Sequence, residues 1–220
     1  KRQGGYSITS LIELLDIDET AEAACEALSH TILIYEAHQS ILEKSSHNTY
    51  AKKIVDSWAE GDWFTSKDPL SESIKAIVFR VDGETNTDDL SPATEAWSRP
   101  DIPLHAKAML IKKMDKPLET IEKLKEKGLP LAYVGDVVGT GSSRKSAINS
   151  VLWHMGEPID YIPNKNSGGI VLGGKIAPIF FNTAEDSGAL PIQCDVSNLN
   201  MGDEITIHPY EGIITDSSGN

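Results

Sequence analysis

The sequence contains only two cysteines, Cys25 and Cys194, among 220 residues. They lie far apart and neither belongs to a Cys-x-x-Cys pair, which argues against both a disulfide framework and a cysteine motif for a metal or cluster. This cysteine usage fits a reducing, cytoplasmic environment. Cys25 falls on the apolar face of a predicted helix and Cys194 in a strand-like run, so we expect both to be core residues.

Long apolar runs are also missing. No stretch approaches the length of a membrane-spanning helix, and the first residues, 1–5, are not followed by the apolar core of a signal peptide. The sequence therefore predicts a protein without a membrane partner. It has no initiator methionine and ends on polar residues, and we expect it to be a fragment of a longer protein.

Positive charge is scarce, because 20 Lys and Arg residues face 33 Asp and Glu residues and leave a net charge of −13. Nonspecific binding to nucleic acids draws on clustered Lys and Arg, so this balance argues against DNA as a partner. A local basic pocket for an acidic small molecule remains compatible with it. The hydrophobic content of 40% and charged content of 24% are those of an ordinary globular protein with one large or two small domains.

Residues 1–68 have the periodicity of helices. Apolar residues recur at spacings of three and four in 10–15, in 18–35 and in 48–60. Antiparallel helices of this length predict part of a helical bundle or helical-repeat array, although the sequence has no clean internal repeat.

The pattern changes after residues 69–73, where a proline and polar residues predict a linker. From 74 to 220, strand-like runs alternate with helical periodicity, which predicts a compact α/β domain. The predicted strands cover about 74–81, 129–134, 170–174, 191–196, 204–208 and 212–215, and the predicted helices cover about 104–114, 118–127, a segment ending at 155 and a segment beginning at 177.

A glycine-rich turn with the sequence GTGSSR lies between one predicted strand and the helix that ends at 155. Gly139 and Gly141 permit tight backbone geometry, and Ser142 or Ser143 can cap the helix. The free N–H groups at a helix start favour an anion, and Arg144 adds a forked donor for a carboxylate or phosphate. The alternative is a capped helix with a surface arginine, because such turns are frequent.

Two further stretches carry candidate site residues. The polar segment 82–93 follows a predicted strand, and its adjacent acids Asp88 and Asp89 could coordinate a cation, orient a base or pair with an arginine. An acidic, solvated loop is the alternative. The segment 99–103 contains two prolines, which predicts a rigid extended stretch that holds Arg99 in place.

Together these stretches resemble the swivel domain of the aconitase superfamily, in which a T-x-D-x-x-S-P-A turn and a G-x-G-S-S-R loop meet at the active site. The matching residues are 86–93, Arg99 and 139–144. Asp-Asp-Leu stands here in place of Asp-His-Ile, and Ser-Ser-Arg-Lys-Ser in place of Ser-Ser-Arg-Glu-His. These differences, together with the preceding helices, resemble the bacterial aconitase B family (aconitate hydratase 2, which also acts on 2-methylisocitrate) over essentially all 220 residues.

The resemblance implies a helical, HEAT-like segment over 1–68 and a swivel domain of β/β/α type over 74–220, truncated at its C-terminus. It implies interconversion of citrate and isocitrate through cis-aconitate, with a 4Fe–4S cluster held by domains outside this sequence and no metal in it.

The same resemblance implies roles for five residues. Ser142 would be the catalytic base, and Ser142, Ser143, Arg144 and Arg99 would bind substrate carboxylates. Asp88 would be a supporting acid that orients Arg144 or a neighbouring group. Because the cluster would be absent, we expect the fragment alone to be inactive.

The expected partners are a tricarboxylate substrate and the cluster-bearing domains of the same chain. In the family that the sequence resembles, the helical domain is tied to homodimerisation and to mRNA binding. The excess of acidic residues gives no physical reason to expect RNA binding, so we favour self-association. Two alternatives remain: a small subunit like that of isopropylmalate isomerase, or a non-enzymatic helical interaction module fused to an α/β ligand-binding domain.

Overall fold

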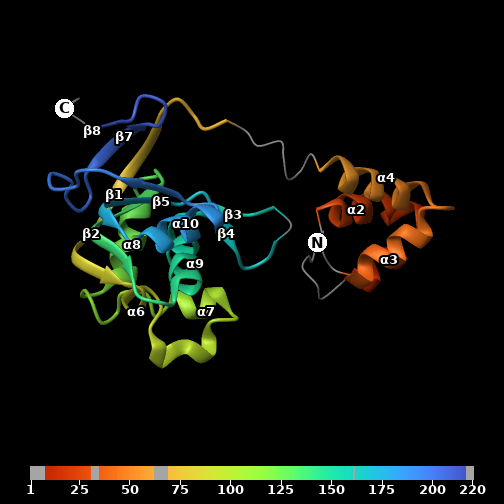
Figure 1. Cartoon of the computed structure of the whole chain (residues 1–220), viewed down its shortest axis with the longest axis horizontal. Coiled ribbons are helices and arrows are strands. Elements are labelled where there is room, and N and C mark those ends of the chain that lie inside the picture. Colours follow the sequence, from red (N-terminus) through yellow and green to blue (C-terminus); the bar gives the residue numbers. More distant parts are fainter. Residues whose placement is uncertain (1–7, 31–34, 62–68, 161, 217–220) are drawn as a thin grey trace. The chain divides into compact units, whose positions relative to one another are not determined.

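The computed structural model describes residues 8–30, 35–61, 69–160 and 162–216. The chain divides into two compact units, one built on helices and the other on a mixed sheet (Figure 1). Residues 69–73 of the predicted linker form neither helix nor strand, while 62–68 lie outside the described residues.

The helical unit is held together by one apolar cluster. Leu28, Ile41 and Ile54 are each fully buried in it. Asn48 caps the last helix, because its Oδ1 accepts a hydrogen bond from the Ala51 N–H at 2.9 Å. The helices are α1 (Ile8–Leu14), α2 (Asp18–Ser29), α3 (Tyr35–Lys44) and α4 (Thr49–Glu60).

One helix prediction for this unit is wrong. The periodicity predicts a single helix over 18–35, whereas α2 ends at Ser29 and a separate helix, α3, begins at Tyr35. Residues 31–34 of the prediction lie outside the described residues. The sequence does not reveal α3 because its buried apolar residues, Ala37 and Ile41, stand among charged and polar ones.

The sheet unit contains a six-stranded sheet in the order β6-β5-β2-β1-β7-β8. The first four of these strands are parallel, and β7 and β8 are antiparallel to their neighbours. A separate two-stranded sheet pairs β3 with β4. The strands are β1 (Ile74–Asn86), β2 (Leu131–Thr140), β3 (Glu157–Pro158), β4 (Asn166–Ser167), β5 (Ile170–Ile176), β6 (Leu190–Gln193), β7 (Glu204–His208) and β8 (Ile213–Asp216).

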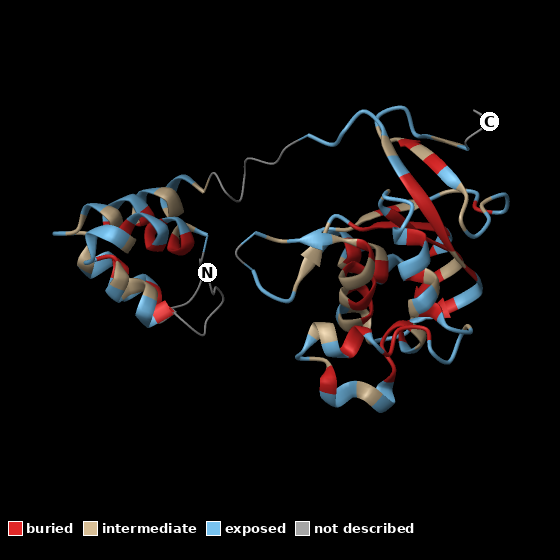
Figure 2. Ribbon diagram, turned by 180° about the vertical axis from the view of Figure 1, so that it is seen from behind, coloured by how far each residue is buried: buried red, intermediate tan, exposed pale blue. Residues whose placement is uncertain are grey.

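Both faces of the parallel strands are buried, as expected of a parallel sheet (Figure 2). On one face Phe79 and Tyr133 pack with Phe180 and the helices that connect the parallel strands. On the other face Val78 and Val134 pack in a second cluster. The connecting helices are α6 (Thr87–Leu90), the 3₁₀ helix η1 (Ala93–Ser98), α7 (Ile102–Ala106), α8 (Pro117–Lys125), α9 (Arg144–Met155) and α10 (Pro178–Asp186).

The strands β1 and β2 run further than the sequence pattern predicts. The alternation ends near Val81, yet β1 continues to Asn86 across a register shift between Val81 and Glu84. The strand β2 likewise continues past Val134 to Thr140 and therefore includes the first glycine of the predicted turn. Glycines and polar residues interrupt these extensions, so they have no apolar periodicity.

Two other predictions in this unit are wrong. A helix over 104–114 is predicted, but α7 ends at Ala106 and the chain then turns, with Leu110 in the left-handed region at a φ of 63°. The segment from Arg99 is not extended, because Arg99 has helical angles (φ −53°, ψ −34°) at the end of η1. The prolines Pro100 and Pro103 lie instead at the end of η1 and in the first turn of α7.

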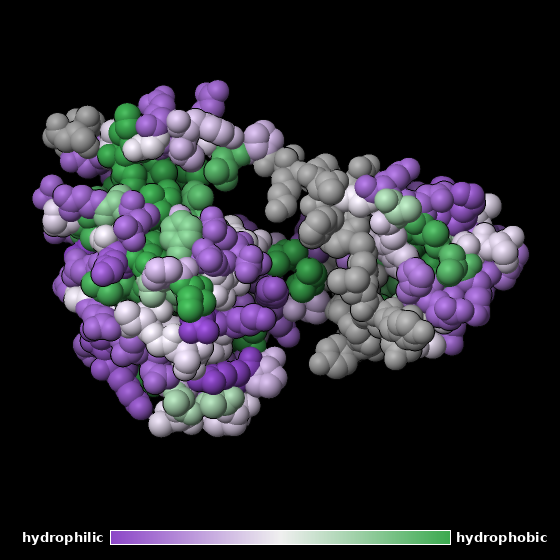
Figure 3. Space-filling model, in the orientation of Figure 1, coloured by the Kyte–Doolittle hydropathy of each residue, from purple (hydrophilic) through white to green (hydrophobic). Residues whose placement is uncertain are grey.

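Apolar residues are exposed near the antiparallel edge of the sheet. Tyr210 is 65% exposed and Ile213 is 47% exposed. In Figure 3, hydrophobic residues gather among hydrophilic ones in the area where Figure 1 draws β1 and β7.

Candidate carboxylate site at the end of the parallel strands

The candidate site lies where β1 and β2 end. Because these strands are parallel and Asn86 pairs with Thr140, the segments that follow both strands start at the same edge of the sheet. The short helix α6 begins at Thr87 and α9 begins at Arg144. The topology therefore brings the acidic turn and the glycine loop together.

A direct hydrogen bond joins these two segments. The backbone N–H of Ser143 donates to Thr87 Oγ1 at 3.2 Å. Gly141, at a φ of 106°, allows this approach, since a Cβ at that position would lie 2.5 Å from Thr87 Oγ1. Thr87 is buried and was not among the residues predicted from the sequence.

The serine side-chain cap predicted for the start of α9 is not formed by Ser143. Ser143 occupies the N-cap position of α9, but its side chain makes no capping hydrogen bond. The hydroxyl of Ser143 instead accepts a hydrogen bond from Arg99 Nη2 at 2.9 Å. Thr87 therefore satisfies an N–H at the start of the helix while the Ser143 hydroxyl faces an arginine.

The two adjacent acids have different environments. Asn86 and Asp89 form a capping box: Asn86 Oδ1 accepts from the N–H groups of Asp88 and Asp89, and the Asp89 carboxylate accepts from the Asn86 N–H at 2.9 Å. The Asp89 carboxylate is thus part of the hydrogen bonds at the boundary between β1 and α6. The Asp88 side chain is exposed at the same edge.

Arg99 reaches the loop from η1. Besides Ser143, its Nη2 contacts the Ser91 carbonyl at 3.4 Å, while its Nε is buried and has no hydrogen-bond partner in the described part of the chain. A buried donor without a partner is unusual in a folded protein. Arg144 is half-buried and donates from Nη1 to the Gly141 carbonyl at 3.0 Å, so it is not oriented by Asp88 through a bond that the structure shows.

The loop opens into a hollow of about 380 Å³. Ser142 is exposed in it, and Ile179 and Thr183 of α10 form its opposite wall. The hollow is lined by Ser142, Ser143, Arg144, Lys145, Ser146, Ile179 and Thr183.

A buried polar network behind the loop is absent from the sequence-based prediction. It contains His105 of α7, Ser91 and Ser146, which are linked by side-chain hydrogen bonds. Burial lowers the pKa of His105, the nearby Arg99 acts in the same direction, and a hydrogen bond to the Glu95 carbonyl opposes both. The ring is therefore neutral at neutral pH.

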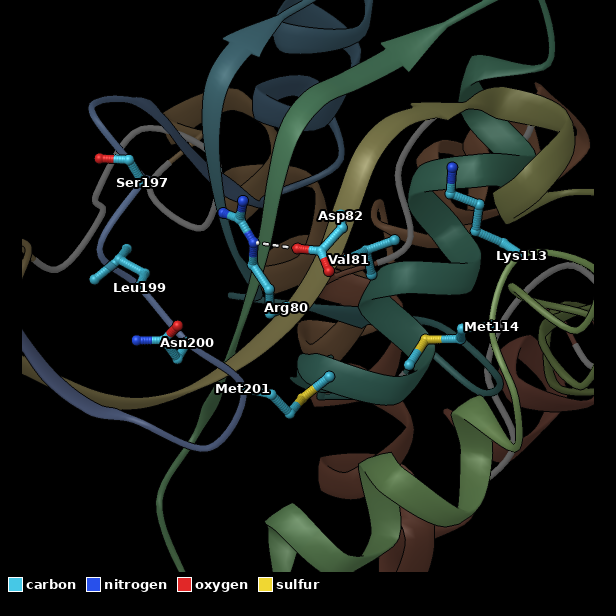
Figure 4. A pocket seen from close by; sticks show the side chains of 9 residues that line it. All are labelled: Arg80, Val81, Asp82, Lys113, Met114, Ser197, Leu199, Asn200 and Met201. Atoms are coloured by element: carbon cyan, nitrogen blue, oxygen red, sulfur yellow. Dashed lines mark hydrogen bonds and ion pairs between the residues drawn. The ribbon is translucent and has the colours of Figure 1, made fainter.

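A second hollow, of about 420 Å³, lies elsewhere on the sheet unit (Figure 4). Arg80 projects into it and donates from Nε to Asp82 at 3.0 Å and from Nη1 to the Val196 carbonyl at 3.0 Å. Arg80 also pairs with Asp136, whose pKa is lowered by the Gly83 N–H and by the arginine. Because these partners already engage the guanidinium, this hollow offers fewer free donors than the glycine loop.

Both cysteines are free thiols. Cys25 is buried in the helical unit, and Cys194 packs against the second apolar face of the sheet. In the described ranges, no three His, Cys, Asp or Glu side chains are grouped so that they could hold a metal ion. Among the same residues, none of the helices has the length and apolar character to cross a membrane.

The fold and the loop at its edge define an N-terminal helical segment followed by a swivel-type α/β domain. A crystal structure of 3-isopropylmalate dehydratase from Methanocaldococcus jannaschii shares this fold with a TM-score of 0.50 and 21% identity, covering 67% of this chain and 78% of that one.

Residues 76–220 match the family described as Aconitate hydratase 2 N-terminus, and residues 1–64 match Aconitate B N-terminal domain. The chain belongs to the aconitate hydratase B family. It is 63% identical to aconitate hydratase B of Synechocystis over 98% of this chain and 25% of that protein. It is 58% identical to that of Escherichia coli over 96% of this chain and 26% of that protein. The chain thus spans about a quarter of the length of these relatives.

The family resemblance drawn from the sequence is confirmed, and so is the order of a helical segment and an α/β domain. The alternative, a small subunit like that of isopropylmalate isomerase, is supported only by a shared fold at low sequence identity. The roles of individual residues stay predictions.

Proposed function

We propose that this chain is part of an aconitate hydratase that interconverts citrate and isocitrate through cis-aconitate and also acts on 2-methylisocitrate. The observation that carries the proposal is the contact of Arg99 with Ser143, which brings an arginine with an unpaired, buried Nε to the glycine loop. Two arginines at one loop suit a tricarboxylate, because each guanidinium can bind one carboxylate through two hydrogen bonds.

In this proposal Arg99, Ser143 and Arg144 bind substrate carboxylates, and Ser142 also contacts the substrate. The Ser142 side chain, as its alkoxide, takes the proton from the substrate carbon and becomes a hydroxyl. A serine is a weak base, so its alkoxide needs stabilisation by N–H groups at the start of α9 and by a neighbouring arginine. Asp88, exposed at the same edge, acts as a supporting acid.

The 4Fe–4S cluster implied by the family does not fit the residues of this chain. Its two cysteines lie in different units, and neither has a grouped set of ligands among the described residues. We propose that the cluster is held in the part of the enzyme that this chain does not include, and we assign it no step here.

The test of the proposed base is Ser142→Ala in the full-length enzyme. General-base catalysis contributes about 10²- to 10⁴-fold, so kcat should fall by that range while substrate still binds. Ser73→Ala, at an exposed serine before β1, is the matched control and should leave kcat unchanged. An unaltered kcat in Ser142→Ala would show that another group is the base.

The isolated chain should have no aconitase turnover. Loss of hydroxide from the substrate requires a strong electrophile, and the residues described here supply none. Measurable conversion of citrate by the purified 220-residue chain, with no other domain present, would contradict this.

For the helical unit we propose self-association into a homodimer. Sedimentation of the chain over a range of concentrations tests this, and a strict monomer at high concentration counts against it. Binding of mRNA and a cytoplasmic location stay predictions without further support, and the net charge of −13 gives no physical reason for RNA affinity.

A further inference from the structure

His105 is a buried histidine whose two ring nitrogens both face polar partners. Its side chain is 2% exposed. Its Nε2 lies 2.7 Å from Ser91 Oγ, while its Nδ1 lies 2.8 Å from Ser98 Oγ and 3.1 Å from the Glu95 carbonyl. A buried ring held on both sides in this way has a defined orientation.

The hydrogen bonds continue from His105 to the glycine loop. Ser91 Oγ lies 2.7 Å from Ser146 Oγ, and Ser146 Oγ lies 3.1 Å from the Ser143 carbonyl. Ser143 is the residue whose side chain receives the Arg99 hydrogen bond. Arg99 also contacts the Ser91 carbonyl, so Ser91 supports both the arginine and the loop.

The partners of Nδ1 place the hydrogen on the ring. Each hydroxyl has one hydrogen, and Ser98 donates its own to the Glu95 carbonyl at 2.8 Å. The two groups near Nδ1, the Ser98 hydroxyl and the Glu95 carbonyl, can therefore only accept, so Nδ1 carries the hydrogen. In the neutral ring Nε2 is then the acceptor for the Ser91 hydrogen, and the hydrogen between Ser91 and Ser146 belongs to Ser146.

We propose that His105 is a positioning residue for the carboxylate site. Its Nε2 accepts the Ser91 hydrogen and so fixes Ser91, which contacts Ser146 of α9 through its hydroxyl and Arg99 through its carbonyl. This holds Arg99 and the start of α9 in the geometry that binds a substrate carboxylate. This inference rests on the proposed function of the glycine loop. It adds a residue from α7 that does not touch the substrate.

The neutral state of the ring agrees with this tautomer. Arg99 and Glu95 are the charged groups that face His105, and the lowered pKa follows mainly from burial. Nδ1–H donates to Ser98 Oγ and faces the Glu95 carbonyl. Small displacements of substrate-binding groups are costly, since about 1 Å can reduce turnover by about 100-fold.

The test compares His105→Phe, His105→Gln and Ser91→Ala in the full-length enzyme. His105→Phe removes the acceptor for Ser91 and should raise KM for citrate and lower kcat/KM by about 10- to 100-fold. His105→Gln retains a side-chain oxygen that can accept from Ser91 and should recover most of this loss. Ser91→Ala should resemble His105→Phe, and the double variant should be no worse than either single variant, because both interrupt one series.

His154→Phe is the matched control, since His154 is a half-buried histidine of α9 that donates to the Ala106 carbonyl at 2.9 Å and lies outside the series. It should lower stability and leave KM for citrate unchanged. If His105→Phe does not fold, KM for citrate in Ser91→Ala and in His105→Gln tests the proposal in its place: it should be raised in the first variant and close to that of the parent enzyme in the second.

Folded His105→Phe with unchanged kinetics, or additive losses in the double variant, would overturn the inference. Failure of the proposed function is a separate result, because it would appear as an unaltered kcat in Ser142→Ala. A series that matters only for folding would change stability equally in the Phe and Gln variants and leave KM constant.

Discussion

Thr87 Oγ1 accepts a hydrogen bond from the backbone N–H of Ser143 at 3.2 Å. The two residues are 56 positions apart and begin the segments that follow two parallel strands. Through this bond, the start of α6 holds the glycine loop in place.

Replacement of Thr87 by valine should destabilise the sheet unit. Valine has a similar shape but no acceptor, so the Ser143 N–H loses its partner at a cost of about 1–3 kcal/mol. Thr87→Ser keeps the hydroxyl and is the matched control. Urea unfolding of both variants measures the difference, and equal midpoints would show that the hydroxyl contributes nothing.

Replacement of Gly139 by alanine should be severely destabilising. Gly139 has a φ of 83°, and a Cβ there would lie 2.1 Å from Cγ of the buried Phe180. Gly128→Ala is the control, because Gly128 has a φ of 75° and no atom within 4 Å of the added Cβ.

Gly128→Ala should lower the free energy of unfolding by about 1–2 kcal/mol, because alanine is strained in this backbone conformation. Gly139→Ala should lower it by a similar amount for the backbone and by about 1–3 kcal/mol more, because the added Cβ overpacks against Phe180. Similar unfolding midpoints for the two variants would mean that Phe180 moves aside without cost.

Arg99→Lys in the full-length enzyme should raise KM for citrate. A lysine is a single point charge and cannot reproduce the fork that contacts Ser143 while presenting Nε. We expect a rise of at least about tenfold, the equivalent of one lost charge-assisted hydrogen bond. Arg80→Lys is the control, since Arg80 is engaged by Asp82 and Asp136, and it should affect stability rather than KM.

The sheet unit should lose stability in mild acid. Burial is the main cause that lowers the pKa of His154 from 6.5; Lys125 acts in the same direction, whereas Glu122 and the Ala106 carbonyl oppose it. Below pH 6.5 the unfolded chain gains a proton that the folded ring resists. Stability is therefore fully present above pH 6.5 and falls as the pH drops toward the folded-state pKa.

His105 has a pKa shift in the same direction and adds to this effect. In His154→Gln, the decrease of unfolding free energy between pH 7 and pH 5 should be smaller than in the parent chain. Above pH 7 the two curves should run parallel, which serves as the internal control. An identical slope in acid would mean that His154 titrates alike in the folded and unfolded chains.

Some features could be predicted from the sequence because they leave a local pattern. Strand β7 matches the prediction over 204–208, where buried and half-buried residues alternate. The end of α9 at Met155 is marked by Gly156. Asn86 and Asp89 have the spacing of a capping box, a signal that distinguishes Asp89 from Asp88 and that the sequence-based interpretation did not use.

Other features depend on distant contacts that have no periodic signal. Arg99 and Ser143 are each predicted as site residues, but their bond depends on η1 folding toward the end of β2. His105 looks like any histidine near a helix in the sequence. Its importance appears only once Ser91 and Ser146, from other segments, are seen on one side of its ring.

Gly139 and Phe180 also bear on how this site can be transplanted or redesigned. The glycine backbone lies against an aromatic ring of α10, which is five elements further along the chain. A graft of the GTGSSR segment alone into another α/β scaffold would carry the polar groups without the surface on which they rest. The smallest exchangeable module therefore includes the start of α6, the loop and the first turn of α10.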